Sequence, residues 1–212
     1  MLCLAHGEHG HRPLASPSTA LDGRKARGPI ARRQSVLPKR ITTKDGKTII
    51  IRHVRDTDAA PLIRLLNEVF AEEAFMLRSS FNQTLEDERV FIRSVSPPNL
   101  YLVAEHKGAL VGWLTLFQNR AEFCRHVAEL GIGVRKDYRG VGIGLALMQT
   151  AQDWAKAVGL EKITLGVRAS NKVAQRLYEK CGFVYEGHRV RQVKHRGEYD
   201  DDFLMAWFAD SA

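Results

Sequence analysis

The run from Leu130 to Gly144 constrains the fold of this chain more than any other feature of its sequence. An apolar strand pattern leads into a turn with three alternating glycines, Gly140, Gly142 and Gly144, and a helix pattern follows at once. Such a turn leaves several backbone N–H groups bare at the start of a helix, where they and the helix dipole can hold a phosphate. Glycine also lets a ligand approach the backbone closely. The stretch therefore predicts a strand, an anion-binding turn and a helix, in that order.

Strand and helix patterns alternate along the chain from Thr48 onward. Their order predicts an α/β (α+β) fold, in which a mixed, mostly antiparallel central sheet is flanked by helices. The expected strands cover 48–54, 100–105, 109–117, 122–134, 162–167, 183–193 and 199–208. The expected helices run from Asp56 or Thr57 to 76, and over 85–95, 145–158 and 171–181.

The first 45 residues differ in composition from the rest, because they contain no aromatic residue and are rich in Gly, Pro, Ser, Arg and His. They cannot bury enough apolar surface to offset the entropy of ordering, so we expect a disordered basic tail over 1–45 and one folded domain over 46–212. Residues 1–40 carry +6 of the net charge of +8. The remaining charge is nearly balanced, which argues against a nucleic-acid partner.

The three cysteines, Cys3, Cys124 and Cys181, are odd in number and widely spaced. This pattern predicts neither a disulfide framework nor a metal site, and it favours a reducing, cytoplasmic setting. No apolar run approaches the roughly 20 residues that a membrane-spanning helix needs, so no membrane partner is expected.

Two nucleotide-binding motifs fail at the glycine turn. A dinucleotide fingerprint needs a third glycine where Leu147 stands, and an acid at the end of the next strand, whereas Glu161 lies before it. A phosphate-binding loop of the Gly-Lys-Ser/Thr type needs those residues where Leu145 and Ala146 follow the turn. The anion at this turn must therefore belong to another ligand.

A second motif follows the turn at a fixed distance: Asn171-x-x-Ala174-x-x-Leu177-Tyr178-x-x-x-Gly182-Phe183. Together with Val134 and Tyr138-Arg139-Gly140-x-Gly142-Ile143-Gly144, it resembles the GNAT superfamily of acetyl-CoA-dependent N-acetyltransferases. The resemblance extends roughly from Thr48 to Phe208. It implies a GNAT-type sheet, acetyl-CoA as the acyl donor, no metal, and an amine as the acceptor.

The resemblance also assigns residues to the donor. It implies that a turn and the first residues of the next helix hold the coenzyme A pyrophosphate, that a strand end binds the pantetheine arm through exposed backbone, and that one asparagine contacts the coenzyme. The pyrophosphate residues are Arg139, Gly140, Val141, Gly142, Ile143, Gly144 and Leu145, the strand end is Ile132, Gly133 and Val134, and the asparagine is Asn171.

The chemistry implied is direct attack of an amine on a thioester, with Tyr178 supplying a proton to the departing thiolate. An alkylammonium has a pKa of about 10, so a base must first remove its proton. Glu129 resembles the acid found at this offset in amine-acetylating branches, and His126 is the alternative. A backbone N–H, that of Val134, is expected to stabilise the oxyanion.

Structural interpretations of the same residues stay open. Tyr178 also fits a core aromatic, Asn171 a helix N-cap, and Glu129 a solvated acid. The acidic runs Glu72-Glu73 and 198–202 suit either a cationic acceptor or solvent. We expect a small-molecule primary amine as acceptor, with a peptide or protein amine, or a non-catalytic acyl-CoA-binding module, as alternatives. A homodimer is among the assemblies left open.

Overall fold

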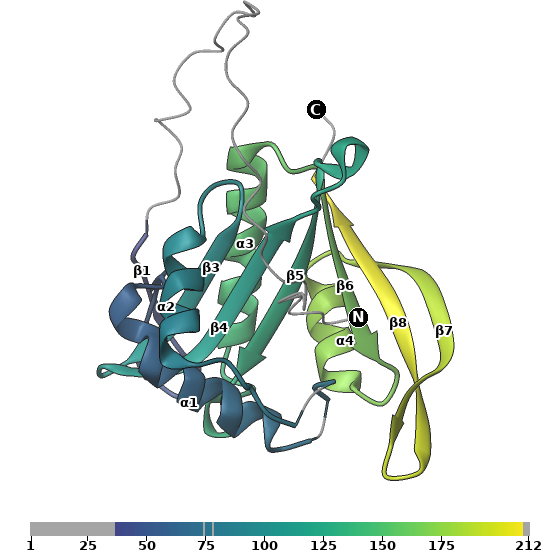
Figure 1. The fold of residues 1–212 in the computed structure, drawn as a ribbon, viewed down its shortest axis with the longest axis horizontal. Coiled ribbons are helices and arrows are strands. Elements are labelled where there is room, and N and C mark those ends of the chain that lie inside the picture. Colours follow the sequence, from purple (N-terminus) through teal and green to yellow (C-terminus); the bar gives the residue numbers. More distant parts are fainter. Residues whose placement is uncertain (1–36, 74, 78, 210–212) are drawn as a thin grey trace, which may run out of the picture.

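The computed structural model describes residues 37–73, 75–77 and 79–209. Its centre is an eight-stranded sheet with the order β1-β2-β3-β4-β5-β6-β8-β7 (Figure 1). All neighbouring strands are antiparallel except β5 and β6, which confirms the mixed, mostly antiparallel sheet predicted from the sequence. The strands are β1 (Lys39–Thr42), β2 (Thr48–His53), β3 (Leu100–His106), β4 (Ala109–Gln118), β5 (Val127–Val134), β6 (Lys162–Arg168), β7 (Val184–His195) and β8 (Glu198–Phe208).

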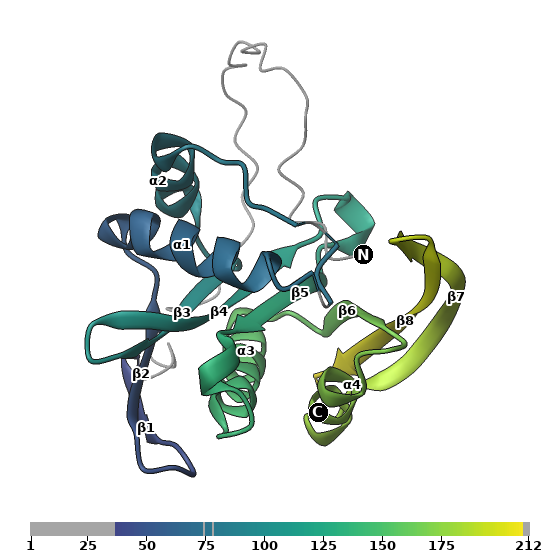
Figure 2. The same cartoon turned by 90° about the horizontal axis from the view of Figure 1, so that it is seen from below.

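Helices cover both faces of this sheet (Figure 2). On one face lie α1 (Ala59–Phe70) and α2 (Leu85–Ser94), packed on a core that includes Trp113. On the other lie α3 (Ile143–Val158) and α4 (Lys172–Lys180), packed on a second core that includes Leu130. Because successive side chains of a strand point to opposite faces, β3 and β4 each contribute to both cores.

Local signals in the sequence place several boundaries correctly. The β3–β4 hairpin turns at Lys107 and Gly108, both with positive φ, as the Lys-Gly signal predicts. Gly159 ends α3 in the left-handed conformation that glycine adopts without steric cost. Thr84 caps α2, since its hydroxyl oxygen accepts the N–H of Asp87 at 3.1 Å.

Three predicted boundaries are wrong. The helix expected from Asp56 or Thr57 to 76 is instead a 3-10 turn (Asp56–Asp58) followed by α1, which ends at Phe70. The strand expected over 122–134 starts only at Val127, because Glu122–Cys124 forms a 3-10 turn. Predicted disorder up to residue 45 is contradicted by β1, whose backbone pairs with β2. The prediction rested on the composition of residues 1–45 as a whole, and so short a strand within them changes that composition too little to be detected. Residues 1–36 lie outside the described part of the chain.

A buried cluster of charges fixes the start of α1. The Arg52 guanidinium of β2 donates to both carboxylate oxygens of Asp58, at 2.6 and 2.9 Å, and to Glu105 of β3 at 2.7 and 2.9 Å. The Asp58 carboxylate also accepts the Arg55 N–H at 2.7 Å. Such charge-assisted pairs are directional, so α1 is held at a defined angle to the sheet.

Glu88 of α2 is a buried acid of a different kind. The residue is 1% exposed, and its carboxyl group has no ion pair among the described residues. Burial raises its pKa from 4.5 to about 7, and Tyr101 opposes part of that rise. The protonated form is therefore the one that the folded protein favours.

Glu88 should make the stability of the domain depend on pH. Since its folded pKa lies above its unfolded pKa, its contribution is complete below pH 4.5 and is lost as the pH rises through about 7. Glu88→Gln should remove this loss and leave the variant more stable than the wild type at pH 8, by about 2 to 3 kcal/mol. Urea unfolding at pH 5 and pH 8 measures the difference.

The matched control is Glu86→Gln on the same helix, where the side chain is exposed and pairs with Arg93. That change should leave the pH slope of the wild type unaltered. If Glu88→Gln follows the same pH dependence as the wild type, the account of the buried acid is wrong.

Candidate active site

The parallel pairing of β5 with β6 stops early and leaves a gap between the two strands. Their register runs only from Val127↔Lys162 to Glu129↔Thr164. On its other edge, β5 stays paired with β4 as far as Val134, and β6 stays paired with β8 as far as Arg168. The last five residues of β5 therefore belong to the sheet on one edge only.

The backbone of β5 alternates between β4 and this gap. Asn119 donates to the Val127 carbonyl and Arg135 donates to the Val111 carbonyl, so the odd-numbered residues of β5 bond to β4. The backbone N–H and C=O groups of the even-numbered residues point toward β6. Beyond the last β5–β6 pair, the N–H groups of Ile132 and Val134 consequently have no strand partner in the described sheet. Exposed donors of this kind are suited to an extended, amide-containing ligand.

Gly133, predicted to bind the cofactor with its two neighbours, occupies a different position. It is opposite Trp113 of β4, so its backbone bonds to that strand instead of facing the gap. A Cβ atom at this position would overlap the indole ring of Trp113. The glycine is required here by packing, and its part in binding stays a prediction.

The glycine turn has the open geometry that the sequence predicts. Gly140 and Gly142 have φ values of 75° and 106°, a region that only glycine enters freely, and the space around both is open. Gly142 is the N-cap of α3 and offers no side chain to the first N–H groups of that helix. Gly144 differs, because a Cβ there would lie 3.1 Å from Leu177 of α4. Two glycines shape the turn and the third allows α3 and α4 to pack closely.

The Arg139 side chain joins the turn to the open end of β5. Its Nε donates to the Val134 carbonyl at 2.7 Å, and its two terminal nitrogens donate to the Glu72 carboxylate, each at 2.7 Å. Other basic groups surround the turn: Arg135 and Lys47 lie over the ring of Tyr138, and the Lys44 N–H donates to the Val141 carbonyl at 3.1 Å. Basic side chains therefore lie near the turn, and the charge of Arg139 itself is paired with Glu72.

Asn171 and Tyr178 come from α4, on the far side of the gap. Asn171 is the N-cap, since its side-chain oxygen accepts the Ala174 N–H at 3.1 Å. Its side-chain NH₂ remains a donor for a ligand. Tyr178 is 6% exposed. Burial, and to a lesser degree Cys181, raises the pKa of the Tyr178 hydroxyl, so it keeps its proton at neutral pH.

A pocket lies in the gap and brings three predicted residues together: Ile132, Asn171 and Tyr178. Sequence reasoning missed the other walls, which come from three segments far apart in the chain. They are Phe75, Met76 and Leu77 after α1, Gly166, Val167 and Arg168 of β6, and Asp202 of β8. The sequence signals for these walls are the acidic run 198–202 and the Glu72-Glu73 pair after α1, which suit a cationic acceptor.

Glu129 lies at the base of the gap and is not among the pocket-lining residues. It is opposite Phe117, which contacts Phe91 of α2, so its side chain is on the α1/α2 face, whereas Tyr178 approaches from the α3/α4 face. Desolvation raises the pKa of Glu129 above its ordinary value, although the residue is exposed, and Arg189 opposes the rise. His126 is exposed and lies further from the gap, before β5 begins.

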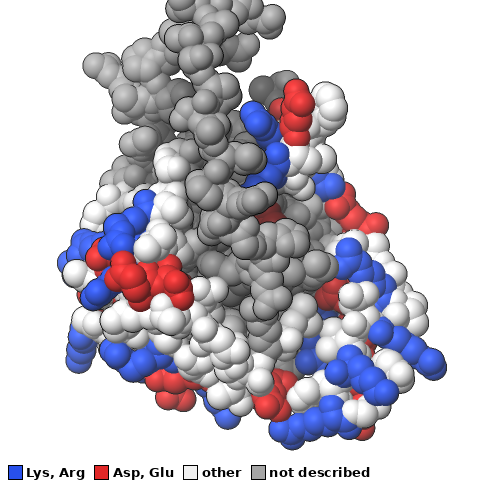
Figure 3. Space-filling model, in the orientation of Figure 1, with Lys and Arg blue, Asp and Glu red and all other residues white. Residues whose placement is uncertain are grey.

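Charges on the acceptor side of the pocket are paired with one another. Lys and Arg side chains gather over the β7–β8 hairpin at the lower right of Figure 3. Acids of β8 lie among them: His188 contacts Asp201 at 2.7 Å, and Arg168 contacts Asp200 at 2.8 Å. The hairpin is thus not a continuous basic stripe.

Comparisons with known proteins identify the class. The sequence model of the acetyltransferase (GNAT) family matches residues 65–183. A solved GNAT acetyltransferase from Streptococcus pneumoniae has the same fold, with a TM-score of 0.72 and 30% identity over 76% of this chain and 98% of that one. This protein therefore belongs to the GNAT acetyltransferase family and is an N-acetyltransferase of that family.

Relatives differ in their acceptors. An L-amino acid N-acetyltransferase from Escherichia coli is 31% identical over 74% of this chain and 96% of its own length. An N-alpha-acetyltransferase from Sulfurisphaera tokodaii is 31% identical over 77% of this chain and 95% of its own. A putative acetyltransferase from Salmonella typhimurium, solved with its cofactor acetyl-CoA, shares the fold with a TM-score of 0.71 and 19% identity, over 77% of this chain and 95% of that one.

The described part of the chain contains neither a candidate membrane-spanning helix nor a candidate metal site. No helix there is long and apolar enough to cross a membrane. Nor do His, Cys, Asp and Glu side chains among those residues form a group of three that could hold a metal ion.

Proposed function

We propose that this protein transfers the acetyl group of acetyl-CoA to the primary amine of a small molecule, by direct attack within a ternary complex. The observation that carries the proposal is the gap between β5 and β6. The unpaired backbone donors of Ile132 and Val134 lie on the edge of β5 that faces this gap, and Ile132 and Tyr178 both line the pocket there. An amide-bearing thioester bound along β5 would thus have a proton donor beside it.

The donor end of the site follows from the same geometry. The Gly140–Gly142 turn and the first N–H groups of α3 would hold the pyrophosphate, with Arg139 and its basic neighbours supplying charge. The Ile132 N–H on the open edge of β5 would bind the pantetheine arm, and Asn171 would donate to the coenzyme from the opposite wall.

The reaction needs one base and one acid. Glu129, directly or through a water, would take a proton from the acceptor ammonium, and the neutral nitrogen would attack the thioester carbonyl carbon. The Val134 N–H, which has no strand partner on this edge of β5, would stabilise the oxyanion. As the C–S bond breaks, the sulfur would take the proton of Tyr178, whose raised pKa keeps that proton in place until then. The nitrogen would lose its second proton as the amide forms, and a proton from solvent would restore the Tyr178 hydroxyl.

The acceptor side supports a small amine. Phe75, Met76 and Leu77 wall the pocket, and Glu73, which precedes them, reaches across to Arg196 of the β7–β8 hairpin. A peptide acceptor requires an open groove between these two segments, and the contact crosses that space. The amino-acid-acetylating relative from Escherichia coli agrees with this choice, while the N-alpha-acetyltransferase relative keeps a peptide N-terminus as the second candidate.

A thiol-release assay with acetyl-CoA tests the function directly. The panel should contain L-amino acids, spermidine, an aminoglycoside and short peptides with free N-termini. We expect kcat/KM for the best small amine to exceed that of any peptide by about 10-fold or more, a difference worth about 1.4 kcal/mol. Preference for a peptide would replace the proposal by the second candidate. Binding of acetyl-CoA without transfer to any acceptor would indicate a non-catalytic module.

Tyr178→Phe tests the proton donor. The ring fills the same buried site and only the hydroxyl is lost, so acetyl-CoA should bind with unchanged affinity while kcat falls about 10²-fold. Calorimetry and the thiol-release assay measure the two quantities on the same preparation.

Glu129→Gln tests whether Glu129 is the base. Glu129→Gln should lower kcat/KM at neutral pH and regain activity as the pH rises, because the free amine then forms without a base. His126→Gln, next to the same strand, is the matched control and should behave as the wild type. Unchanged turnover in Tyr178→Phe, or a larger loss in His126→Gln than in Glu129→Gln, would overturn these assignments.

A further inference from the structure

Two consecutive acids after α1, Glu72 and Glu73, pair with opposite sides of the site. Glu72 accepts two hydrogen bonds from Arg139, each of 2.7 Å, in the bidentate geometry that arginine and carboxylate favour. The same Arg139 holds the Val134 carbonyl at the open end of β5. Glu72 is therefore connected, through one side chain, to both the glycine turn and the strand beside the gap.

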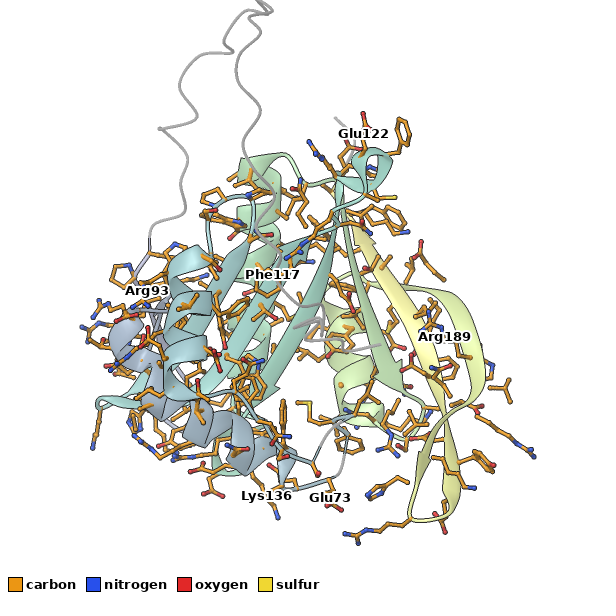
Figure 4. All side chains as sticks on the ribbon, in the orientation of Figure 1. Glu73, Arg93, Phe117, Glu122, Lys136 and Arg189 are labelled. Atoms are coloured by element: carbon orange, nitrogen blue, oxygen red, sulfur yellow. The ribbon has the colours of Figure 1, made fainter. Side chains whose placement is uncertain are left out.

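Glu73 points to the hairpin instead. Its carboxylate accepts from Arg196 at 2.6 Å and contacts His195 at 3.2 Å, at the tip of β7–β8. Figure 4 shows Glu73 between the end of α1 and this tip. Arg196 above all, with His195, lowers the pKa of Glu73, so the acid is charged at neutral pH. A positive φ of 48° at Glu73 turns the chain there, which lets adjacent carboxylates reach different partners.

The chain that carries these two acids also walls the pocket. Phe75, Met76 and Leu77 follow directly and line it beside Ile132 and Tyr178. The Glu72–Arg139 and Glu73–Arg196 ion pairs are both at least partly exposed. Exposed ion pairs add little to global stability. Their effect is local: they fix where this wall stands relative to the donor turn and the hairpin.

We propose that Glu72 and Glu73 are positioning residues that couple the acetyl-CoA site to the acceptor side of the pocket. Glu72 carries the coupling from Arg139 to the end of α1, and Glu73 carries it on to the β7–β8 hairpin. This inference rests on the proposed function, because it takes the glycine turn as the acetyl-CoA site. An energetic coupling between two sites must act in both directions, so it can be measured from the donor side alone.

Hydrogen exchange read by mass spectrometry, with acetyl-CoA as the only ligand, tests the coupling. In the wild type, saturating acetyl-CoA should slow exchange at the hairpin tip, residues 194–197, by about 5-fold, as expected for one exposed pair becoming firmer. Glu72→Gln and Glu73→Gln should each abolish this slowing. Only Glu72→Gln should also weaken acetyl-CoA binding in calorimetry, by about 5-fold, because Glu73 does not touch the donor turn.

Glu86→Gln is the matched control, since it removes another exposed arginine pair, that with Arg93 on α2, outside the site. It should retain both the binding affinity and the slowed exchange. If acetyl-CoA binds but the hairpin tip is unaffected in the wild type, or is still protected in Glu72→Gln, the coupling is refuted while the proposed function stands. If acetyl-CoA does not bind at all, the proposed function itself fails.

Discussion

The early end of the β5–β6 pairing is the constraint on which the rest of this structure depends. Backbone N–H and C=O groups inside a protein need partners, and a sheet normally supplies them on both edges of a central strand. Here the pairing ends at Glu129↔Thr164, in the middle of the sheet. The fold thus keeps a short segment of strand edge open at its centre, where a ligand can complete what the sheet leaves unpaired.

β5 and β6 can diverge and still remain regular strands, because each is fully paired with its other neighbour in the sheet. β5 is held by seven residue pairs with β4, and β6 by seven with β8. The end of β6 is also bound to α4, because Gln175 donates to the Arg168 and Ala169 carbonyls at 2.9 and 3.0 Å. This contact sets the direction of α4, and with it the place of Tyr178 on the wall of the gap. The position of Tyr178, the proposed proton donor, therefore follows from the contacts at the end of β6.

Local sequence patterns predicted those parts of the site that depend on nearby residues. The glycine turn, the N-cap at Asn171 and the closing hairpin are specified within a few residues, and each forms as expected. The pairing of Glu72 with Arg139 joins positions 67 residues apart, so no local pattern announces it. Likewise, the packing reason for Gly133 appears only when Trp113 is placed opposite. Tertiary contacts decided what local propensity left open.

Amide exchange at single residues of β5 tests the central claim most directly. With two-dimensional NMR, the amides of Ile132 and Val134 should exchange quickly in the free protein and become protected when acetyl-CoA is added. Those of Gly131 and Gly133, which bond to β4, should be protected in both states. Such an alternation would place the ligand along the open edge. If Ile132 and Val134 stay unprotected in the saturated complex, the gap between β5 and β6 is not where acetyl-CoA binds.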